Sequence, residues 1–279
     1  MGKVIAVVNQ KGGVGKTTTS VNLAASLSVL EQRTLLIDMD SQGNATTGMG
    51  LNKRAVEKSV YDFILTEELD EDTINQIIVK PSYTNVNEYI NIIPSNNDLV
   101  SAEYELFKMI AREYKLKQAL EKIKNRFDFI IIDCPPSLSL LTLNALAAAD
   151  SVLIPIQCEF FALEGLAELL STVRTVQKTV NSQLQIEGAL LTMYDARLNL
   201  SKQVAQDVRD YFKEKVFTTP VRRNVKLSEA PSMGEPILAY DIVSSGAEDY
   251  FQLAEEIINR NRTATDDGQK EEISATQGA

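Results

Sequence analysis

The sequence contains no histidine and only two cysteines in 279 residues. Without histidine there is no imidazole base and no histidine ligand for a metal, so any catalysis has to use carboxylates, lysines and a metal held by oxygen atoms. Cys134 and Cys158 form neither a disulfide framework nor a CxxC pair. Because this cysteine usage is typical of a reducing compartment, we expect a cytoplasmic protein.

Long hydrophobic runs are also missing. No apolar stretch approaches the roughly 18–20 residues of a membrane helix, and the N-terminus lacks the charged-then-apolar layout of a signal peptide. Charged residues make up 24% of the chain and hydrophobic residues 44%, a balance typical of a globular domain with a buried core. We therefore expect no association with a membrane.

The charge is strongly acidic overall but is unevenly distributed. The net charge is −10, which by itself argues against a nucleic-acid partner. Residues 197–226 nevertheless hold eight basic and three acidic side chains, a net charge of +5 that leaves −15 for the remainder. This basic window is either a solvated face or a surface for nucleic acid.

Short apolar runs that alternate with helical patterns predict an α/β fold, doubly wound, with a mostly parallel sheet and helices on both faces. The predicted strands lie within residues 3–9, 33–40, 91–95, 127–136, 151–157 and 186–194. The predicted helices lie within residues 16–30, 98–125, 139–149, 163–180, 201–215 and 246–261. We expect residues 51–89 to cap one edge of the sheet, residues 1–262 to form one domain, and residues 263–279 to be an acidic, disordered tail.

A glycine-rich turn, NQKGGVGKTTT at residues 9–19, joins the first predicted strand to the first predicted helix. It matches the phosphate-binding pattern G-x-x-x-x-G-K-[ST] except that Gln10 replaces the first glycine, which makes it the variant K-G-G-x-G-K-T. Here Lys16 would neutralise the β- and γ-phosphates of ATP and the Thr17 hydroxyl would ligate Mg²⁺. The alternative is a plain glycine turn before a helix. The residues predicted to bind the nucleotide are Gly12, Gly13, Val14, Gly15, Lys16, Thr17 and Thr18.

Acidic residues follow two other predicted strands. Asp133 ends the run FIIID, the arrangement of a carboxylate that serves a magnesium nucleotide. Asp38 and Asp40 follow the second strand, at the sheet edge where open α/β sheets bind ligands. We predict that Asp40 orients the attacking water and that Asp38 supports it by hydrogen bonding. The alternative is that both aspartates only terminate the strand.

Four stretches together resemble the ParA family of chromosome- and plasmid-partition ATPases, in its short Soj-like branch. They are KGGVGKTTTSVNLA, DMDSQGNAT, FIIIDCPPSLSLLTLNAL and RNVKLSEAP, and the similarity runs in order from Lys3 to about Asn261. The resemblance implies a P-loop ATPase domain of the deviant Walker A type. It also gives a role to Lys11, which the phosphate-binding motif leaves unexplained: in this family the first lysine contacts phosphates bound by the partner subunit of an ATP-dependent homodimer.

The same resemblance implies the remaining site residues and partners. Asp40 matches the aspartate needed for hydrolysis, and Asp133 the residue that holds Mg²⁺ through water. Arg197 and Lys226 match positions of DNA-contacting arginines, which implies binding of double-stranded DNA of the nucleoid without sequence preference. A ParB-type centromere-binding protein would stimulate hydrolysis.

One departure from the family affects the base of the nucleotide. Many relatives have a proline where this chain has Arg222, so we assign only Asn224 as a candidate contact to the adenine. The alternative functions are a MinD-like division-site or other cargo-positioning ATPase, an iron–sulfur ATPase and a small-molecule phosphotransferase. A MinD-like protein would end in a basic amphipathic helix, whereas this chain ends in an acidic segment.

Overall fold

A computed structural model describes residues 2–83, 87–159 and 164–277, with backbone only for residues 164 and 263–277. Within these ranges six strands form one sheet, ordered β3-β2-β4-β1-β5-β6, and every strand pairing in it is parallel. The strands are β1 (Lys3–Val7), β2 (Thr34–Asp38), β3 (Ile90–Ile93), β4 (Phe129–Asp133), β5 (Ser151–Gln157) and β6 (Gln185–Thr192). Each overlaps a predicted strand, which confirms the predicted parallel sheet.

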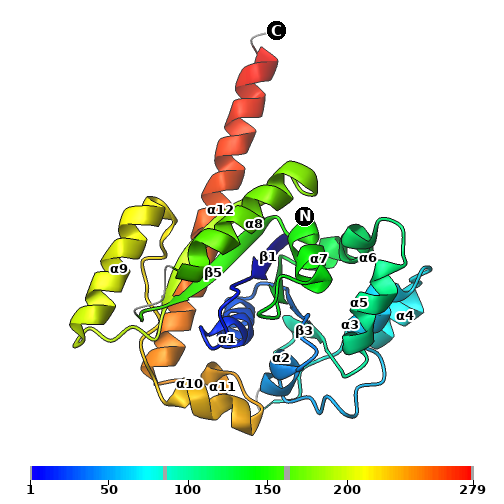
Figure 1. Ribbon diagram of the computed structural model, residues 1–279, viewed down its shortest axis with the longest axis horizontal. Helices are drawn as coiled ribbons and strands as arrows, with labels where there is room; N and C mark the ends of the chain where they lie inside the picture. The colour runs from blue at the N-terminus through cyan, green and yellow to red at the C-terminus, as the bar shows by residue number, and fades with distance from the viewer. Residues whose placement is uncertain (1, 84–86, 160–163, 278–279) are drawn as a thin grey trace.

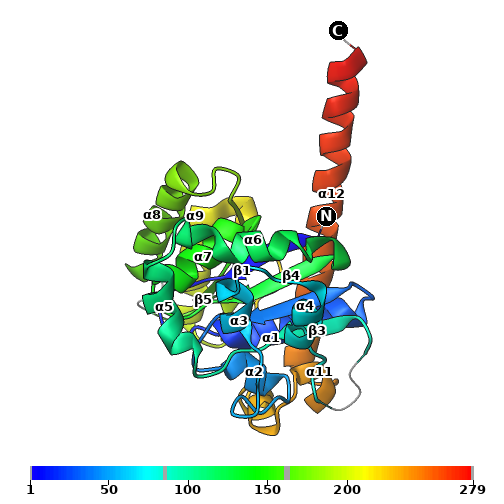
Figure 2. The same ribbon diagram turned by 90° about the vertical axis from the view of Figure 1, so that its right-hand side faces the viewer.

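Helices cover both faces of this sheet (Figures 1 and 2), as the sequence predicts. Ile5 and Val7 of β1 enter a core shared with α1 and α12, whereas Val4 and Ala6 enter a core on the opposite face with α6, α7 and α8. The α-helices are α1 (Lys16–Val29), α2 (Asn44–Gly48), α3 (Val60–Leu65), α4 (Glu71–Ile77), α5 (Leu99–Phe107), α6 (Lys115–Glu121), α7 (Leu140–Ala148), α8 (Glu164–Thr179), α9 (Asn199–Phe212), α10 (Lys226–Glu229), α11 (Ile237–Tyr240) and α12 (Ser245–Gln277). Short 3₁₀ helices span Arg112–Tyr114, Lys124–Arg126, Lys213–Lys215 and Ala230–Met233.

The long helix predicted for residues 98–125 is wrong. The segment divides into α5, a 3₁₀ turn and α6, with Ala111 at φ 52° between them. The buried side chain of Asn144 on α7 holds this break, because it donates to the carbonyl of Arg112 (2.9 Å) and accepts from the N–H of Leu116 (3.1 Å). Bonds from a distant helix thus replace helical bonds within the segment, and local periodicity carries no sign of them.

The segment 51–89 lies along β3, the edge strand of the sheet. It contains α3 and α4, and Val79 forms an antiparallel bridge with Ile92 of β3. Because that bridge pairs the exposed edge of β3, the predicted role of this segment as an edge cap is confirmed.

The final helix, α12, packs its first turns on α1 and then extends away from the body (Figures 1 and 2). Tyr250, Leu253 and Ile257 are buried in the core beside α1. The backbone continues as a helix to Gln277, through the residues for which the sequence predicts disorder. The side chains beyond Arg262 lie outside the described ones, so the division at residue 262 stays a prediction.

Asn144→Leu tests whether this side chain holds the break between α5 and α6. It leaves the half-buried carbonyl of Arg112 and the buried N–H of Leu116 without their partner, so we expect a loss of about 2–4 kcal/mol in the free energy of unfolding. Urea denaturation measures it. Asn125→Leu, at an exposed position, is the control and should change stability by less than about 0.5 kcal/mol. Equal stability of the two variants would contradict this account of the break.

Candidate functional site

The glycine-rich turn connects β1 to α1 at the carboxyl edge of the sheet. Gly13 and Gly15 have φ angles of 74° and 89°, a left-handed conformation that side chains disfavour. A Cβ atom at Gly12 or Gly13 would meet no atom within 4 Å, so the turn faces open space there. The N-terminus of α1, which begins directly after Gly15, opens onto the same space and favours an anion in it.

Lys16 is the first residue of α1 and is only 7% exposed. Its Nζ atom donates a hydrogen bond to the carbonyl oxygen of Lys11 at 3.1 Å, which folds the side chain back along the turn. Burial lowers the pKa of Lys16, and the negative charges of Asp133 and Asp40 act in the opposite direction. A buried ammonium group at this point can neutralise phosphate oxygens held by the turn.

Two buried carboxylates lie side by side below the turn. The register of β2 on β4 places Asp38 beside Asp133, and neither is exposed to solvent. Asp38 accepts hydrogen bonds from the hydroxyl (2.7 Å) and N–H (2.8 Å) of Thr46 and from the N–H of Asp40 (3.2 Å). Asp133 Oδ1 accepts from the Ser20 hydroxyl at 2.8 Å, whereas Oδ2 has no hydrogen-bond partner among the described residues.

Hydrogen bonds therefore offset only part of the cost of burying the negative charges of these two carboxylates. Burial, with a smaller contribution from the charge of Asp38, raises the pKa of Asp133 to about 7, against the opposing effect of the Ser20 and Thr17 hydroxyls. Burial also raises the pKa of Asp38, against the hydrogen bonds from Thr46. Such a site favours uptake of positive charge beside Asp133, either a proton or a cation.

A cleft of about 570 Å³ brings most of the predicted site residues together. The side chain of Asp40 is part of its wall and accepts a hydrogen bond from the N–H of Gln42 at 2.9 Å. The phosphate loop and the segment after β4 form the other walls. The lining residues are Gly12, Gly13, Gly15, Lys16, Thr17, Thr18, Asp40, Ser41, Gln42, Asn44, Pro135, Pro136, Ser137 and Met193.

A second cavity, of about 340 Å³, adjoins the cleft and shares Thr17, Thr18 and Asn44 with it. Residues 231–235, after α10, form its outer wall. Asn224, the candidate adenine contact, lines neither cavity: its amide donates to the Ser245 hydroxyl (2.9 Å) and its oxygen accepts from the N–H of Lys226 (2.8 Å). Its assignment to the base stays a prediction.

Lys11 lies outside the cleft lining. Its N–H donates to the side chain of Asn9 at 3.0 Å, and its carbonyl accepts from Lys16. The cleft of one chain therefore holds Lys16 but not Lys11.

The two predicted DNA-contacting side chains lie on different segments of the basic window. Arg197 follows β6 and pairs with Asp195 (2.7 Å), and Lys226 begins α10 and pairs with Glu229 (3.0 Å). The pair with Arg197 lowers the pKa of Asp195 to about 2. Both cations therefore carry internal carboxylate partners, which the charge count of the window does not indicate.

Comparison with known proteins extends over almost the whole chain. A family model described as an AAA domain matches residues 2–186. The sporulation initiation inhibitor protein Soj of Bacillus subtilis is 56% identical over 257 residues, which cover 92% of this chain and 98% of Soj. The chromosome partitioning protein ParA of Myxococcus xanthus is 49% identical over 261 residues, covering 94% and 89%.

The chain belongs to the Soj/ParA family of chromosome-partitioning ATPases.

A solved structure of a nucleotide-bound relative is also similar. Cobyrinic acid a,c-diamide synthase from Mycobacterium smegmatis, with bound ADP and magnesium, is 36% identical with a TM-score of 0.80, and the match covers 95% of this chain and 97% of that one. The same synthase is known with a bound ATP analogue and magnesium. The predicted family and α/β fold of this Soj/ParA member are thereby confirmed.

Three side chains of the site were not predicted. Ser20 bonds Asp133 from one turn beyond Lys16, and its i+4 position on α1 is a sequence signal that could have indicated it. Thr46 holds Asp38 through a tertiary contact that has no local signal. Arg222 bonds Asp249 through its main-chain N–H (2.8 Å) and its guanidinium, so it braces α12.

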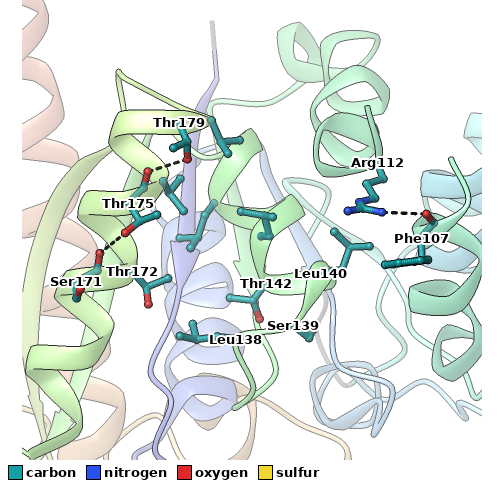
Figure 3. A pocket seen from close by; sticks show the side chains of 14 residues that line it. Phe107, Arg112, Leu138, Ser139, Leu140, Thr142, Ser171, Thr172, Thr175 and Thr179 are labelled. Carbon is teal, nitrogen blue, oxygen red and sulfur yellow. Dashed lines mark hydrogen bonds between the residues drawn. The ribbon is translucent and has the colours of Figure 1, made fainter. Parts of the chain in front are cut away.

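A separate groove of about 520 Å³ lies on the face that carries α7 and α8 (Figure 3). Leu140 and Thr142 of α7 form its floor, Thr175 of α8 one wall, and Phe107 and Arg112 the other. The chain segment after Asp133 contributes to both depressions, because Pro135–Ser137 line the cleft and Leu138–Leu140 line the groove.

A helix long and apolar enough to span a bilayer is not found in the part of the chain that the structure describes.

Asp133→Asn tests the electrostatic description of the site. A raised carboxyl pKa favours the fold below the unfolded pKa near 4, and this contribution is lost as pH rises through about 7. Asparagine stays neutral, so we expect Asp133→Asn to be more stable than the parent protein by about 4 kcal/mol at pH 8 and by only about 1–2 kcal/mol at pH 5.

Urea denaturation in the presence of a chelator and without nucleotide measures this difference. A variant that is less stable than the parent at pH 8 would contradict the description.

Proposed function

We propose that this chain hydrolyses ATP to ADP and phosphate with Mg²⁺ and uses the reaction to move DNA. The observation that carries the proposal is that Lys16 and Asp40 line one cleft at the open phosphate loop, with the buried carboxylate of Asp133 near enough to act on the charge of Lys16. The similarity to a synthase solved with ADP and with an ATP analogue, each with magnesium, supports a magnesium nucleotide in the cleft.

The residues at the cleft fit a magnesium ion. Thr17 offers a hydroxyl in the cleft wall, and Asp133 offers a buried carboxylate oxygen without a partner, a donor set of the hard oxygen type that Mg²⁺ prefers. Thr17 would hold the ion directly and Asp133 through water. When bound, the ion neutralises charge on the phosphate oxygens.

The remaining groups position the reaction. The main chain from Gly12 to Gly15, with Thr18, binds the phosphates, and Lys16 neutralises them. Asp40 orients a water molecule for attack on the γ-phosphate, and Asp38 holds the Asp40 segment through its bond to the Asp40 N–H. The second cavity is the space next to the phosphates that a nucleoside can occupy.

Lys11 acts on the other subunit of an ATP-dependent homodimer. Its absence from the cleft lining of its own chain, which its neighbours Gly12 and Gly13 do line, supports this assignment. A lysine supplied in trans adds positive charge where the transition state develops negative charge. ATP therefore joins two copies, and hydrolysis releases them.

The dimer binds double-stranded DNA of the nucleoid without sequence preference. Arg197 and Lys226, with side chains 87% and 45% exposed, would exchange their internal carboxylates for DNA phosphates. Exposed ion pairs contribute little stability, so the exchange is feasible. Two copies double the number of phosphate contacts, which makes the affinity depend on ATP through dimerisation.

The proposed partner and cellular location are those that membership of the Soj/ParA family implies. A ParB-type centromere-binding protein stimulates hydrolysis and so releases the dimer from DNA. The names of ParA from Myxococcus xanthus, a chromosome partitioning protein, and of Soj from Treponema pallidum, a chromosome-partitioning ATPase, support a role in partition. The protein works in the cytoplasm, on the nucleoid. Residues 1–262 form the ATPase domain and residues 263–279 an acidic tail.

Asp40→Ala tests the proposed function. Loss of the group that orients water should reduce hydrolysis by about 10²-fold or more while ATP still joins two copies. The variant should therefore accumulate as an ATP-bound dimer, visible by sedimentation. It should bind random duplex DNA tightly with ATP but not with ADP, with an affinity that falls steeply with salt.

Fluorescence anisotropy at two salt concentrations measures the DNA binding. Wild-type turnover in this variant would show that another group orients the water. Failure to bind DNA with either nucleotide would refute the DNA-binding role.

A further inference from the structure

The end of β6 is attached to the phosphate loop. Thr192, the last residue of β6, is 2% exposed and donates its hydroxyl hydrogen bond to the carbonyl oxygen of Val14 at 2.8 Å. A Cβ atom at Gly15 would lie only 3.8 Å from the Thr192 methyl group, so the two segments are in close contact. A shift of the phosphate loop should therefore displace Thr192.

The next residue, Met193, has a strained backbone. Its φ is 51°, in the left-handed region that is unfavourable for a long side chain, and it lines the nucleotide cleft. Non-glycine residues persist in this conformation only where their surroundings hold them, and they concentrate at ligand clamps and switches. The backbone conformation of Met193 thus depends both on the cleft that it lines and on the contacts made by the residues after it.

The chain after Met193 carries Arg197 and is hydrogen-bonded to a second segment that carries Arg223. The N–H of Tyr194 donates to the carbonyl of Val221, and the N–H of Arg223 donates to the carbonyl of Tyr194, each at 3.0 Å. Asp195 accepts both the N–H and the guanidinium of Arg197. The hydrogen bonds of Arg197 lower the pKa of Asp195, and the positive charge of Arg223 adds a smaller effect in the same direction.

From these contacts we infer that Thr192 and Met193 couple the phosphate loop to a DNA-binding pair formed by Arg197 and Arg223. The ligand in the cleft determines the backbone conformation of Met193. The main-chain hydrogen bonds of Tyr194 transmit that conformation to the segments that carry Arg197 and Arg223. Arg223, whose side chain is 57% exposed and 3.4 Å from Glu159, becomes a second phosphate contact beside Arg197. The inference rests on the proposed function, because it concerns how ATP controls the same DNA surface.

Met193→Gly and Thr192→Val test the coupling in the Asp40→Ala background, where hydrolysis does not interfere. Glycine adopts positive φ without strain, and valine keeps the shape of threonine while removing its bond to Val14. The measured quantity is the ratio of affinities for random duplex DNA at saturating ATP and saturating ADP. We expect each variant to reduce this ratio about fivefold or more, the lower end of typical couplings between sites.

Ala111→Gly is the matched control, since Ala111 has φ 52° but lies between α5 and α6, outside the cleft lining. It should leave the ratio unchanged. Sedimentation with ATP should show that the test variants still dimerise. Arg223→Ala should weaken DNA binding with ATP and reduce its salt dependence by about one phosphate contact.

Several outcomes would overturn the inference. It would be overturned if the ratio of DNA affinities were unchanged in both Met193→Gly and Thr192→Val. It would also be overturned if Ala111→Gly lowered the ratio equally, or if both test variants lost the ATP-bound dimer. Arg197→Glu separates this failure from that of the proposed function. If Arg197→Glu removes DNA binding while the test variants keep the ratio, only the coupling is wrong; if it leaves binding intact, the DNA surface itself is wrong.

Discussion

Two buried carboxylates at the carboxyl edge of the sheet set the charge balance on which the site depends. Asp38 and Asp133 lie in register on β2 and β4, where desolvation disfavours two negative charges. Lys16 compensates part of this charge, and Thr46 and Ser20 provide hydrogen bonds. What remains without a hydrogen bond is one oxygen of Asp133, so the fold keeps an unfavourable interaction there that a proton or a bound cation would relieve.

The strand order explains why the edge of the sheet at Asp38 and Asp133 is only a few residues of chain away from other surfaces of the molecule. β1 and β4 are neighbours, but β1 leads into α1 on one face and β4 leads towards α7 on the other, so a crevice opens between their carboxyl ends. The segments that follow β1, β2, β4 and β6 all contribute residues to the cleft at this edge. The segment after Asp133 continues into the groove of Figure 3, and the segment after β6 continues to Arg197. The cleft, the groove and Arg197 are therefore separated by a few residues of chain rather than by a domain.

Local features were predictable from the sequence, and long-range pairings were not. Continuous apolar runs indicated all six strands, and the glycine turn indicated the phosphate loop because its spacing is local. The break between α5 and α6 was not predictable, since Asn144 imposes it from another helix. Likewise the basic window did not reveal that Arg222 braces Asp249 or that Arg197 faces Asp195, because charge counting takes no account of partners. The roles of Lys11, Asp40 and Asn224 stay predictions.

The central claim is that each cleft is completed by Lys11 of a second copy, and mixing two inactive variants tests it most directly. Lys11→Ala lacks the lysine supplied in trans, and Asp40→Ala lacks the carboxylate supplied in cis. In a mixed dimer, one cleft has its own Asp40 and receives Lys11 from the other copy. Equal mixing should therefore restore about a quarter of the wild-type ATPase rate, if copies pair at random. No restored activity, with both variants still binding ATP and forming mixed dimers, would contradict the claim.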